Sequence, residues 1–121
     1  MKIFIVDDSS FSRKVLGDAI RAALPDAELV PCLDGLDALE KFKAGPAPDA
    51  ATIDMVMPRM SGLELIEELR KIGIATRLIV VTADIQTSTR ERCAALQVSD
   101  FIEKPITAEK IRNAFQKMFG S

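Results

Sequence analysis

Histidine, tryptophan and tyrosine are all absent from this chain of 121 residues. The absence of histidine excludes Ser-His-Asp triads, histidine metal ligands and phosphohistidine chemistry on the chain itself. Without tryptophan and tyrosine, the six phenylalanines are the only side chains that could stack on a flavin or on single-stranded nucleic acid. Binding proteins built on aromatic platforms are therefore disfavoured.

Cysteine is scarce, since Cys32 and Cys93 are the only two and no CxxC pair occurs. Two isolated thiols in apolar or helical sequence are typical of small core residues in a reducing compartment. The first apolar run covers only residues 3–6 and is followed by two aspartates, so we expect neither a signal peptide nor a membrane span. These features predict a soluble, cytoplasmic protein.

The chain also lacks an excess of charge of either sign. It carries 16 basic and 18 acidic residues, which gives a formal net charge of −2. We therefore expect no direct binding to nucleic acid and no attachment to a membrane surface. The length fits one compact domain over residues 1–121, and we expect a monomer.

Short apolar runs alternate five times with amphipathic stretches. The runs cover residues 3–6, 27–32, 50–54, 78–81 and 98–102 and predict strands. Continuous apolar strands that alternate with helices are typical of βαβ units, with helices on both faces of a parallel sheet. The pattern predicts an α/β fold with a doubly wound five-stranded parallel sheet.

The amphipathic stretches carry recognisable helix starts and stops. The first has its apolar face at Phe11, Val15, Leu16, Ala19, Ile20 and Ala23 and is stopped by Pro25. Asp34 is predicted to cap a helix that continues through Leu36, Leu39 and Phe42. Residues 61–64 and 88–91 have the spacing of capping boxes, and Thr107 is predicted to cap the last helix.

Polar side chains follow four of the five predicted strands. The residues are Asp7, Asp8, Asp54, Thr82 and Lys104. Because the carboxyl ends of parallel strands meet at one edge of a sheet, we expect these side chains to lie together. Each of them alone would be assigned to a turn, a strand or the solvated surface. Their common position at one edge predicts a functional site.

The chemistry of this set favours a hard cation. Three carboxylates placed together repel one another unless a cation joins them. Oxygen ligands without histidine or cysteine favour Mg²⁺ over zinc or copper. A third carboxylate could act as a nucleophile, while Thr82 and Lys104 offer a hydroxyl and a positive charge to phosphoryl oxygens.

Four segments resemble the receiver domains of two-component response regulators in their order, in their placement relative to the strands and in their spacing. The segments are Val-Asp-Asp at 6–8, Asp-Met-Val-Met-Pro at 54–58 with Ser-Gly at 61–62, Val-Thr-Ala at 81–83, and Phe-Ile-Glu-Lys-Pro at 101–105. The resemblance covers essentially the whole chain and is strongest to single-domain, CheY-like receivers of the chemotaxis type. It implies the flavodoxin-like strand order 2-1-3-4-5.

The resemblance implies that Asp54 accepts a phosphoryl group from a partner histidine kinase or from a small phosphodonor. It also implies a bound Mg²⁺ held by Asp8, Asp54 and the main-chain carbonyl of Val56, with Asp7 acting largely through water. Such a protein is a phosphoacceptor switch and not an enzyme with an external substrate. It catalyses only its own phosphorylation and dephosphorylation.

The resemblance further implies that Thr82 and Lys104 contact the phosphoryl oxygens, with a cis peptide bond between Lys104 and Pro105. Thr82 and Phe101 would form the switch, because Thr82 moves toward the phosphoryl group and the ring can fill the vacated space. The face made by the fourth helix, fifth strand and fifth helix would then change its affinity for a downstream target protein. Residues 82–86 also resemble receivers that work with CheC/CheX-type phosphatases.

Several positions depart from the family pattern, and two of them bear on the structure. Phe101 stands where chemotaxis receivers commonly have tyrosine, and without a hydroxyl the ring is expected to sit inward more often in the unphosphorylated protein. Gln97 stands where a helix-ending glycine is expected, so a left-handed backbone there would be strained.

Three alternatives stay open. A flavodoxin-like redox protein would share the architecture but needs a hydroxyl-rich phosphate loop and stacking aromatics. A haloacid-dehalogenase-type phosphatase needs Asp-x-Asp, which residues 54–56 do not provide. The most serious alternative is a degenerate receiver that acts as a phosphorylation-independent binding module or as a phosphate sink.

Overall fold

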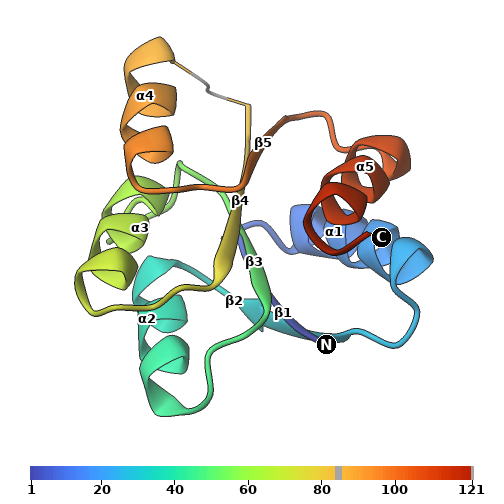
Figure 1. Cartoon of the computed structure of the whole chain (residues 1–121), viewed down its shortest axis with the longest axis horizontal. Helices are drawn as coiled ribbons and strands as arrows, with labels where there is room; N and C mark the ends of the chain where they lie inside the picture. Colours follow the sequence, from blue (N-terminus) through green and yellow to red (C-terminus); the bar gives the residue numbers. More distant parts are fainter. Residues whose placement is uncertain (84–85, 121) are drawn as a thin grey trace.

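The computed structural model describes residues 1–83 and 86–120, and within these residues five strands alternate with five helices (Figure 1). The strands are β1 (Lys2–Val6), β2 (Glu28–Cys32), β3 (Ala50–Ile53), β4 (Arg77–Thr82) and β5 (Asp100–Glu103). The helices are α1 (Ser10–Ala23), α2 (Gly35–Ala44), α3 (Gly62–Lys71), α4 (Thr87–Ala95) and α5 (Ala108–Phe119). The number, type and order of the predicted elements are confirmed.

All neighbouring strands are parallel, in the order β2-β1-β3-β4-β5. Helices α1 and α5 lie on one face of the sheet, and α2, α3 and α4 lie on the other (Figure 1). This confirms the doubly wound sheet and the strand order 2-1-3-4-5. The carboxyl ends of all strands consequently share one edge.

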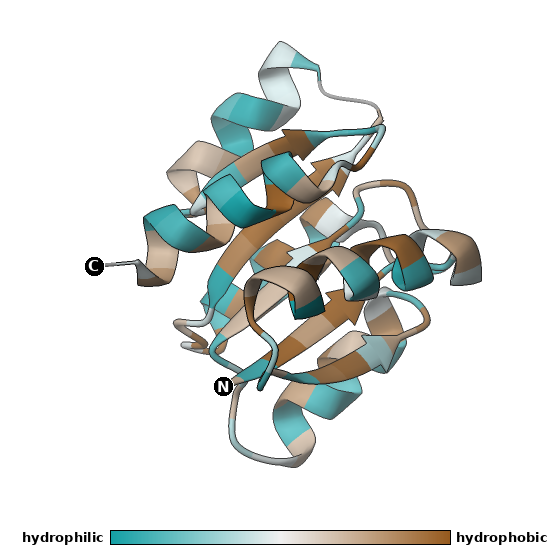
Figure 2. Cartoon of the chain, turned by 90° about the vertical axis from the view of Figure 1, so that its right-hand side faces the viewer, coloured by the Kyte–Doolittle hydropathy of each residue, from teal (hydrophilic) through white to brown (hydrophobic). Residues whose placement is uncertain are grey.

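Alternation of side chains along the strands divides the core into two layers. Ile3 and Ile5 of β1 pack toward α1 and α5, whereas Phe4 and Val6 pack toward α2 and α3. Figure 2 shows hydrophobic colouring along the central strands and hydrophilic patches on the helices around them. Strands buried on both faces explain why the apolar runs in the sequence are continuous.

The two cysteines are core residues, as predicted. Cys32 and Cys93 are fully buried in the layer beneath α2, α3 and α4. Burial raises the pKa of the Cys32 thiol to about 12 and also raises the pKa of the Cys93 thiol. Both sulfurs are therefore held in the unreactive thiol form.

Most predicted helix starts are confirmed. Ser61 Oγ accepts from the backbone N–H of Glu64 at 3.2 Å, and the Glu64 carboxylate accepts from the backbone N–H of Ser61 at 3.0 Å. Asp34 and Thr107 cap α2 and α5. The capping box predicted at residues 88–91 is wrong, because α4 already begins at Thr87 and Ser88 lies inside its first turn.

Two apolar residues assigned to buried helix faces are exposed. Phe11 is 75% exposed and Leu36 is 39% exposed. Both lie in the first turn of their helices, next to the carboxyl edge of the sheet. Phe11 precedes the buried residues of α1, whereas Leu36 lies between the buried residues Gly35 and Ala38 of α2. For Phe11, helical periodicity predicts the direction of the side chain but not where along the helix the sheet begins to cover it.

The end of α4 explains why β5 begins two residues later than predicted. The backbone N–H groups of Gln97 and Val98 donate to the carbonyls of Ala94 and Cys93 at 3.0 and 3.2 Å, so Val98 closes the last helical turn. Gln97 has φ +62°, as expected from its position. Gly73 (φ +85°) ends α3 in the same way.

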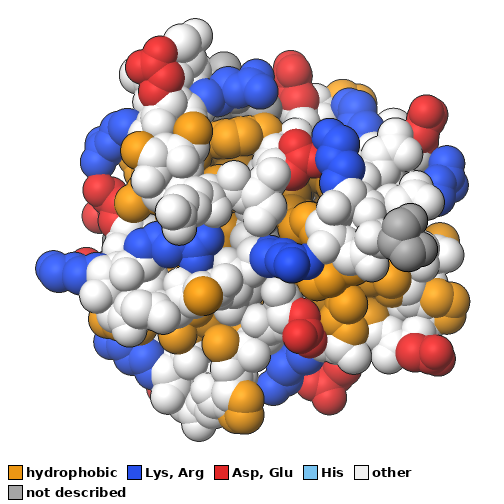
Figure 3. Space-filling model, viewed as in Figure 1, with side chains coloured by type: hydrophobic (Ala, Val, Ile, Leu, Met, Phe, Trp, Pro, Cys, Tyr) orange, Lys and Arg blue, Asp and Glu red, His pale blue; other side chains and the backbone are white. Residues whose placement is uncertain are grey.

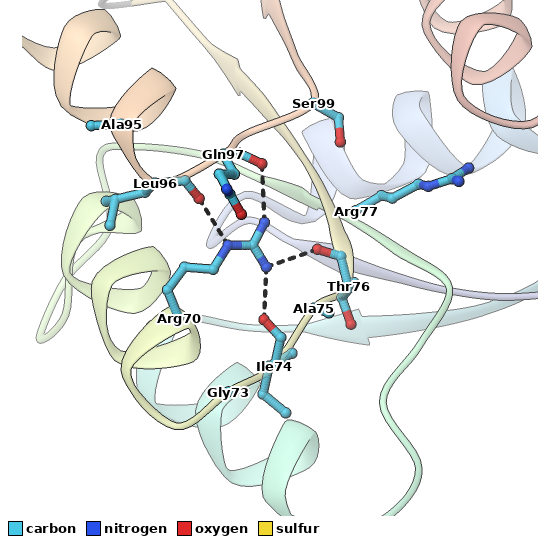
Figure 4. A pocket seen from close by; sticks show the side chains of 10 residues that line it. All are labelled: Arg70, Gly73, Ile74, Ala75, Thr76, Arg77, Ala95, Leu96, Gln97 and Ser99. Carbon is cyan, nitrogen blue, oxygen red and sulfur yellow. Dashed lines mark hydrogen bonds between the residues drawn. The ribbon is translucent and has the colours of Figure 1, made fainter.

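Arg70 ties these two helix ends together (Figure 4). Its guanidinium donates to the carbonyls of Leu96 at 2.8 Å and Gln97 at 3.2 Å. It also donates to the carbonyls of Ile74 at 2.8 Å and Thr76 at 3.1 Å. Arg70 thereby satisfies helix-end and loop carbonyls that the helices leave without partners.

Replacing Gln97 by glycine is expected to raise the free energy of unfolding by about 1 kcal/mol, because glycine adopts the left-handed conformation without steric strain. Gly73→Ala should lower it by a similar amount for the converse reason. Urea unfolding followed by far-ultraviolet circular dichroism measures both changes, and a loss of stability in Gln97→Gly would contradict the assignment.

The surface carries charges of both signs. On the face shown in Figure 3, acidic and basic side chains are interspersed rather than gathered by sign. Among the described residues, no helix is long and apolar enough to cross a membrane.

Candidate functional site

The sheet brings the predicted site residues to one edge. Asp7 and Asp8 directly follow β1, Asp54 directly follows β3, Thr82 is the last residue of β4, and Lys104 directly follows β5. One carboxylate oxygen from each of the three aspartates lies within 4.8 Å of the other two. Asp7 and Asp54 are buried, and Asp8 is exposed to solvent.

Lys104 reaches into this cluster of carboxylates. Its Nζ lies 3.0 Å from Asp54 Oδ2, 3.3 Å from Asp7 Oδ2 and 3.4 Å from Ser12 Oγ. The predicted cis peptide bond between Lys104 and Pro105 is present. Burial lowers the pKa of the Lys104 ammonium, but the hydrogen bond and charge of Asp54 outweigh this, and the net effect is a raised pKa.

Asp7 is the most deeply enclosed carboxylate of the cluster. Its Oδ1 accepts from the backbone N–H of Ser9 at 2.9 Å, and the Arg13 guanidinium donates to its backbone carbonyl at 2.6 Å. Burial raises the pKa of the Asp7 carboxyl, and the charge of Asp54 adds to this rise. The Ser9 and Lys104 contacts oppose the rise without cancelling it.

Asp54 is positioned by the loop that follows it. Its Oδ1 accepts from the backbone N–H of Val56 at 3.2 Å, while the Val56 side chain is 64% exposed. The backbone N–H of Gly62 donates to the carbonyl of Met55 at 3.0 Å and closes the loop. A Cβ atom at Gly62 would lie 2.2 Å from the Asp54 carbonyl oxygen, so α3 can approach so closely only with glycine there.

Thr82 and Phe101 lie on the neighbouring strands β4 and β5. Thr82 is buried, and its backbone carbonyl accepts from the Lys104 N–H at 3.0 Å. The Phe101 ring is half-buried against the core, and the Arg90 guanidinium of α4 lies 5.1 Å from its centroid. The inward preference of this ring stays a prediction.

In the segment 82–86 that suggested a phosphatase partner, residues 84 and 85 lie outside the described residues.

Three residues of the site were not found from the sequence, and a fourth, Gly62, was found only as part of a family motif. Ser12 and Arg13 approach the cluster from α1, Gly62 supports Asp54, and Arg90 covers Phe101. None of them lies at a strand end, the position that the alternation of strands and helices marks in the sequence. Only the spacing of Gly62 after Ser61 was visible as a motif, and its close approach to Asp54 was not.

Replacing Asp7 by asparagine is expected to raise the free energy of unfolding at neutral pH by about 1 kcal/mol in metal-free buffer, because it removes a buried charge from a cluster with an excess of carboxylates. Because folding raises the pKa of Asp7, the folded state binds the Asp7 proton more tightly than the unfolded chain does. The stability that this proton contributes is fully present at pH values below the ordinary carboxyl pKa and is lost as the pH rises through the raised pKa. The gain should therefore vanish in acid. Urea unfolding at both pH values tests this, and an equal gain at both would contradict it.

The arrangement matches the requirements of a divalent cation site. The donor set is oxygen-only, and three carboxylates face one ammonium group, which leaves negative charge for a cation to neutralise. Lys104 Nζ donates to Asp54 Oδ2, and the backbone N–H of Val56 donates to Asp54 Oδ1. Such a carboxylate is held in one orientation and can act as a nucleophile.

Comparison with known proteins points to one family. The family model of the response regulator receiver domain matches residues 3–116. The chain is 32% identical over 120 residues to the chemotaxis protein CheY of Bacillus subtilis (strain 168), covering 96% of this chain and 95% of that protein. It is 37% identical over 107 residues to protein-glutamate methylesterase/protein-glutamine glutaminase 5 of Myxococcus xanthus (strain DK1622), covering 87% of this chain and 30% of that protein. The chain thus spans less than a third of the second relative.

Solved structures share the fold. The Vibrio cholerae chemotaxis protein CheY4 superposes with a TM-score of 0.84 at 23% identity, covering 96% of both chains. The response regulator protein TrrA of Thermotoga maritima, solved in complex with Mg(2+)-BeF, superposes with a TM-score of 0.81 at 25% identity, covering 98% of both chains.

Proposed function

The chain belongs to the response regulator receiver family, and on this premise we propose that residues 1–121 form one receiver domain that accepts a phosphoryl group on Asp54 and thereby switches its affinity for a partner. The observation that carries the proposal is the contact of Lys104 Nζ with Asp54 Oδ2 at 3.0 Å, inside a cluster of three carboxylates. A nucleophilic carboxylate, a neighbouring cation and a metal-type donor set occur together at one strand edge. Phosphoryl transfer needs these three parts.

In the proposed reaction, an Asp54 carboxylate oxygen attacks phosphorus and a P–O bond forms. The bond that breaks is the P–N bond of a kinase phosphohistidine or the P–O bond of an acyl phosphate, and the leaving group departs with the electron pair. Lys104 Nζ lies within hydrogen-bond distance of Asp54, so its ammonium would stabilise the negative charge of the phosphoryl oxygens when the group is bound to Asp54. Thr82, buried at the end of the neighbouring strand, would supply a hydroxyl.

The residues fit Mg²⁺ by the chemistry of their donors. Asp8, Asp54 and the main-chain carbonyl of Val56 would hold the ion, with Asp7 acting largely through water. When bound, Mg²⁺ supplies positive charge that neutralises the incoming phosphoryl group. The chain itself contributes the rigid placement of Asp54 and Asp7 by the N–H groups of Val56 and Ser9.

Surface features next to the site support a protein phosphodonor. The exposed side chains of Phe11 and Val56 follow β1 and β3 at the same edge as Asp54. Apolar side chains around a charged centre are typical of a docking surface. We therefore propose a histidine kinase as the donor. Because such a kinase takes its phosphoryl group from ATP, we place the reaction in the cytoplasm.

The proposed output is a change in the face formed by α4, β5 and α5. Helix α4 buries only Cys93 among its residues, so it is weakly held and suited to shift. Phe101, half-buried between α4 and the sheet, is the residue through which Thr82 would act on this face. A downstream target would bind there, and a CheC/CheX-type phosphatase would end the signal. Chemotaxis is the pathway that the CheY relatives favour.

The test is intact-mass measurement after incubation with Mg²⁺ and acetyl phosphate or phosphoramidate. We expect the mass of one phosphoryl group to be added to the wild-type chain. The increment should vanish in Asp54→Asn and in the presence of a chelator, because both remove the acceptor chemistry. Absence of any increment with every donor would overturn the proposal and leave a phosphorylation-independent binding module.

A further inference from the structure

Arg59 has the least favourable backbone conformation next to the proposed acceptor. It lies in the loop between β3 and α3 and has φ +68°, a region that side chains with a Cβ atom rarely adopt. The backbone N–H of Met60 donates to the carbonyl of Pro58 at 2.8 Å, which closes a tight three-residue turn around Arg59. A strained residue of this kind persists only where its surroundings hold it.

The surroundings that hold Arg59 are at the start of α2. Its Nε donates to Asp34 Oδ2 at 3.0 Å, and its Nη2 donates to the same oxygen. The other oxygen of Asp34 accepts from the backbone N–H of Asp37 at 2.9 Å and caps the helix. The backbone N–H of Asp37 and then the Arg59 guanidinium lower the pKa of the Asp34 carboxyl, so the pair is charged at neutral pH.

A second contact joins the same two segments one residue further on. A Cβ atom at Gly35 would lie 2.7 Å from the Met60 carbonyl oxygen and 2.9 Å from the Met60 side chain. The tip of the loop is therefore seated directly on the first turn of α2. Both contacts hold the loop three to four residues beyond Val56, whose carbonyl is a proposed Mg²⁺ ligand.

We propose that the Asp34–Arg59 ion pair is a latch that holds residues 56–60 in the conformation needed at the metal site. Asp34 and Arg59 belong neither to the proposed Mg²⁺ ligands nor to the proposed phosphoryl contacts, so they are positioning residues. This inference rests on the proposed function for its Mg²⁺ ligand set. The ion pair offsets the strain at Arg59, and a variant that removes the strain makes the pair dispensable.

The test compares variants by isothermal titration with Mg²⁺. Arg59→Ala keeps the unfavourable conformation and loses the pair, and we expect about 10-fold weaker Mg²⁺ binding, the size typical of groups that orient metal ligands. Arg59→Gly also loses the pair but relieves the strain, so it should bind Mg²⁺ several-fold more tightly than Arg59→Ala. Equal affinities in Arg59→Ala and the wild type would overturn the latch.

Asp34→Asn provides the reciprocal test, because asparagine still caps α2 but carries no charge. We expect it to weaken Mg²⁺ binding in the wild-type background and to have no further effect in Arg59→Gly. An equal loss in both backgrounds would show that Asp34 acts only through α2 and would overturn the proposal. Arg92→Ala is the matched control, since it breaks the exposed Arg92–Glu67 ion pair away from the site and should leave Mg²⁺ affinity unchanged.

Hydrogen exchange in metal-free buffer separates this inference from the proposed function. Amides of residues 55–62 should exchange faster in Arg59→Ala and Asp34→Asn than in the wild type and in Arg92→Ala. Equal exchange in all four would overturn the latch whatever the phosphorylation result. Faster exchange together with an absence of phosphorylation in the wild type would support the latch and overturn the proposed function.

Discussion

Gly62→Ala is expected to lower the free energy of unfolding by about 3 kcal/mol and to disturb the proposed acceptor directly. The added Cβ atom would lie 2.2 Å from the Asp54 carbonyl oxygen and 2.7 Å from Met55 Cε. The carbonyl belongs to the backbone at the end of β3 and cannot rotate away, so either α3 or Asp54 must move. Urea unfolding gives the change in stability, and acetyl phosphate labelling should be slower than in the wild type.

Gly45→Ala is the matched control for this substitution. A Cβ atom at Gly45 would meet no atom within 4 Å, and its φ of −164° is extended backbone that alanine adopts readily. We expect its stability to stay within about 0.5 kcal/mol of the wild type. Similar stabilities of the two variants would contradict the close approach of α3 to Asp54.

Lys104→Met is expected to produce two separable losses. Labelling by acetyl phosphate should fall by about 10²–10³-fold, because the cation nearest to Asp54 is removed. Stability in chelator at neutral pH should fall by about 3 kcal/mol, because the buried carboxylates of Asp7 and Asp54 lose their common partner. Intact-mass kinetics and urea unfolding measure the two effects.

The pH dependence of Lys104→Met shows whether charge is the cause. Without the ammonium, which lowers the pKa of the Asp7 carboxyl, that raised pKa rises further in the folded state. The folded protein then binds more protons than the unfolded chain between the ordinary and the raised pKa of Asp7. Stability of the variant should then increase as the pH falls toward the ordinary carboxyl range. Adding Asp7→Asn should restore stability but not the labelling rate, and restoration of both would contradict a direct role of Lys104 in the reaction.

The fold was predictable because its signals are local. The apolar runs at the five strands, the capping residues Asp34, Ser61 and Thr107 and the stop at Pro25 each act within a few residues. The errors arose where the outcome depends on distant parts. Phe11 follows the apolar pattern of α1 but lies beyond the sheet, and Ser88 has capping-box spacing inside a helix that already begins at Thr87.

The site was predictable to the extent that topology alone brings strand ends together. Asp7, Asp8, Asp54, Thr82 and Lys104 were identified from their positions after strands, and the parallel sheet does place them at one edge. The residues that contact these side chains lie on other elements, and no periodic pattern in the sequence marks them. Arg13 reaches back from α1 to the Asp7 carbonyl, and Arg59 reaches α2 across 25 positions of the sequence.

By itself, the sequence determined the class of fold, the strand edge that carries the candidate site residues and the exclusion of histidine chemistry on the chain, because residue type and short-range pattern suffice for these. Only the tertiary structure decided which groups touch. It placed Lys104 between Asp7 and Asp54, Gly62 against the Asp54 carbonyl and Arg59 on Asp34. Contacts of this kind depend on packing to within an ångström between segments far apart in the chain, and no local pattern encodes that distance.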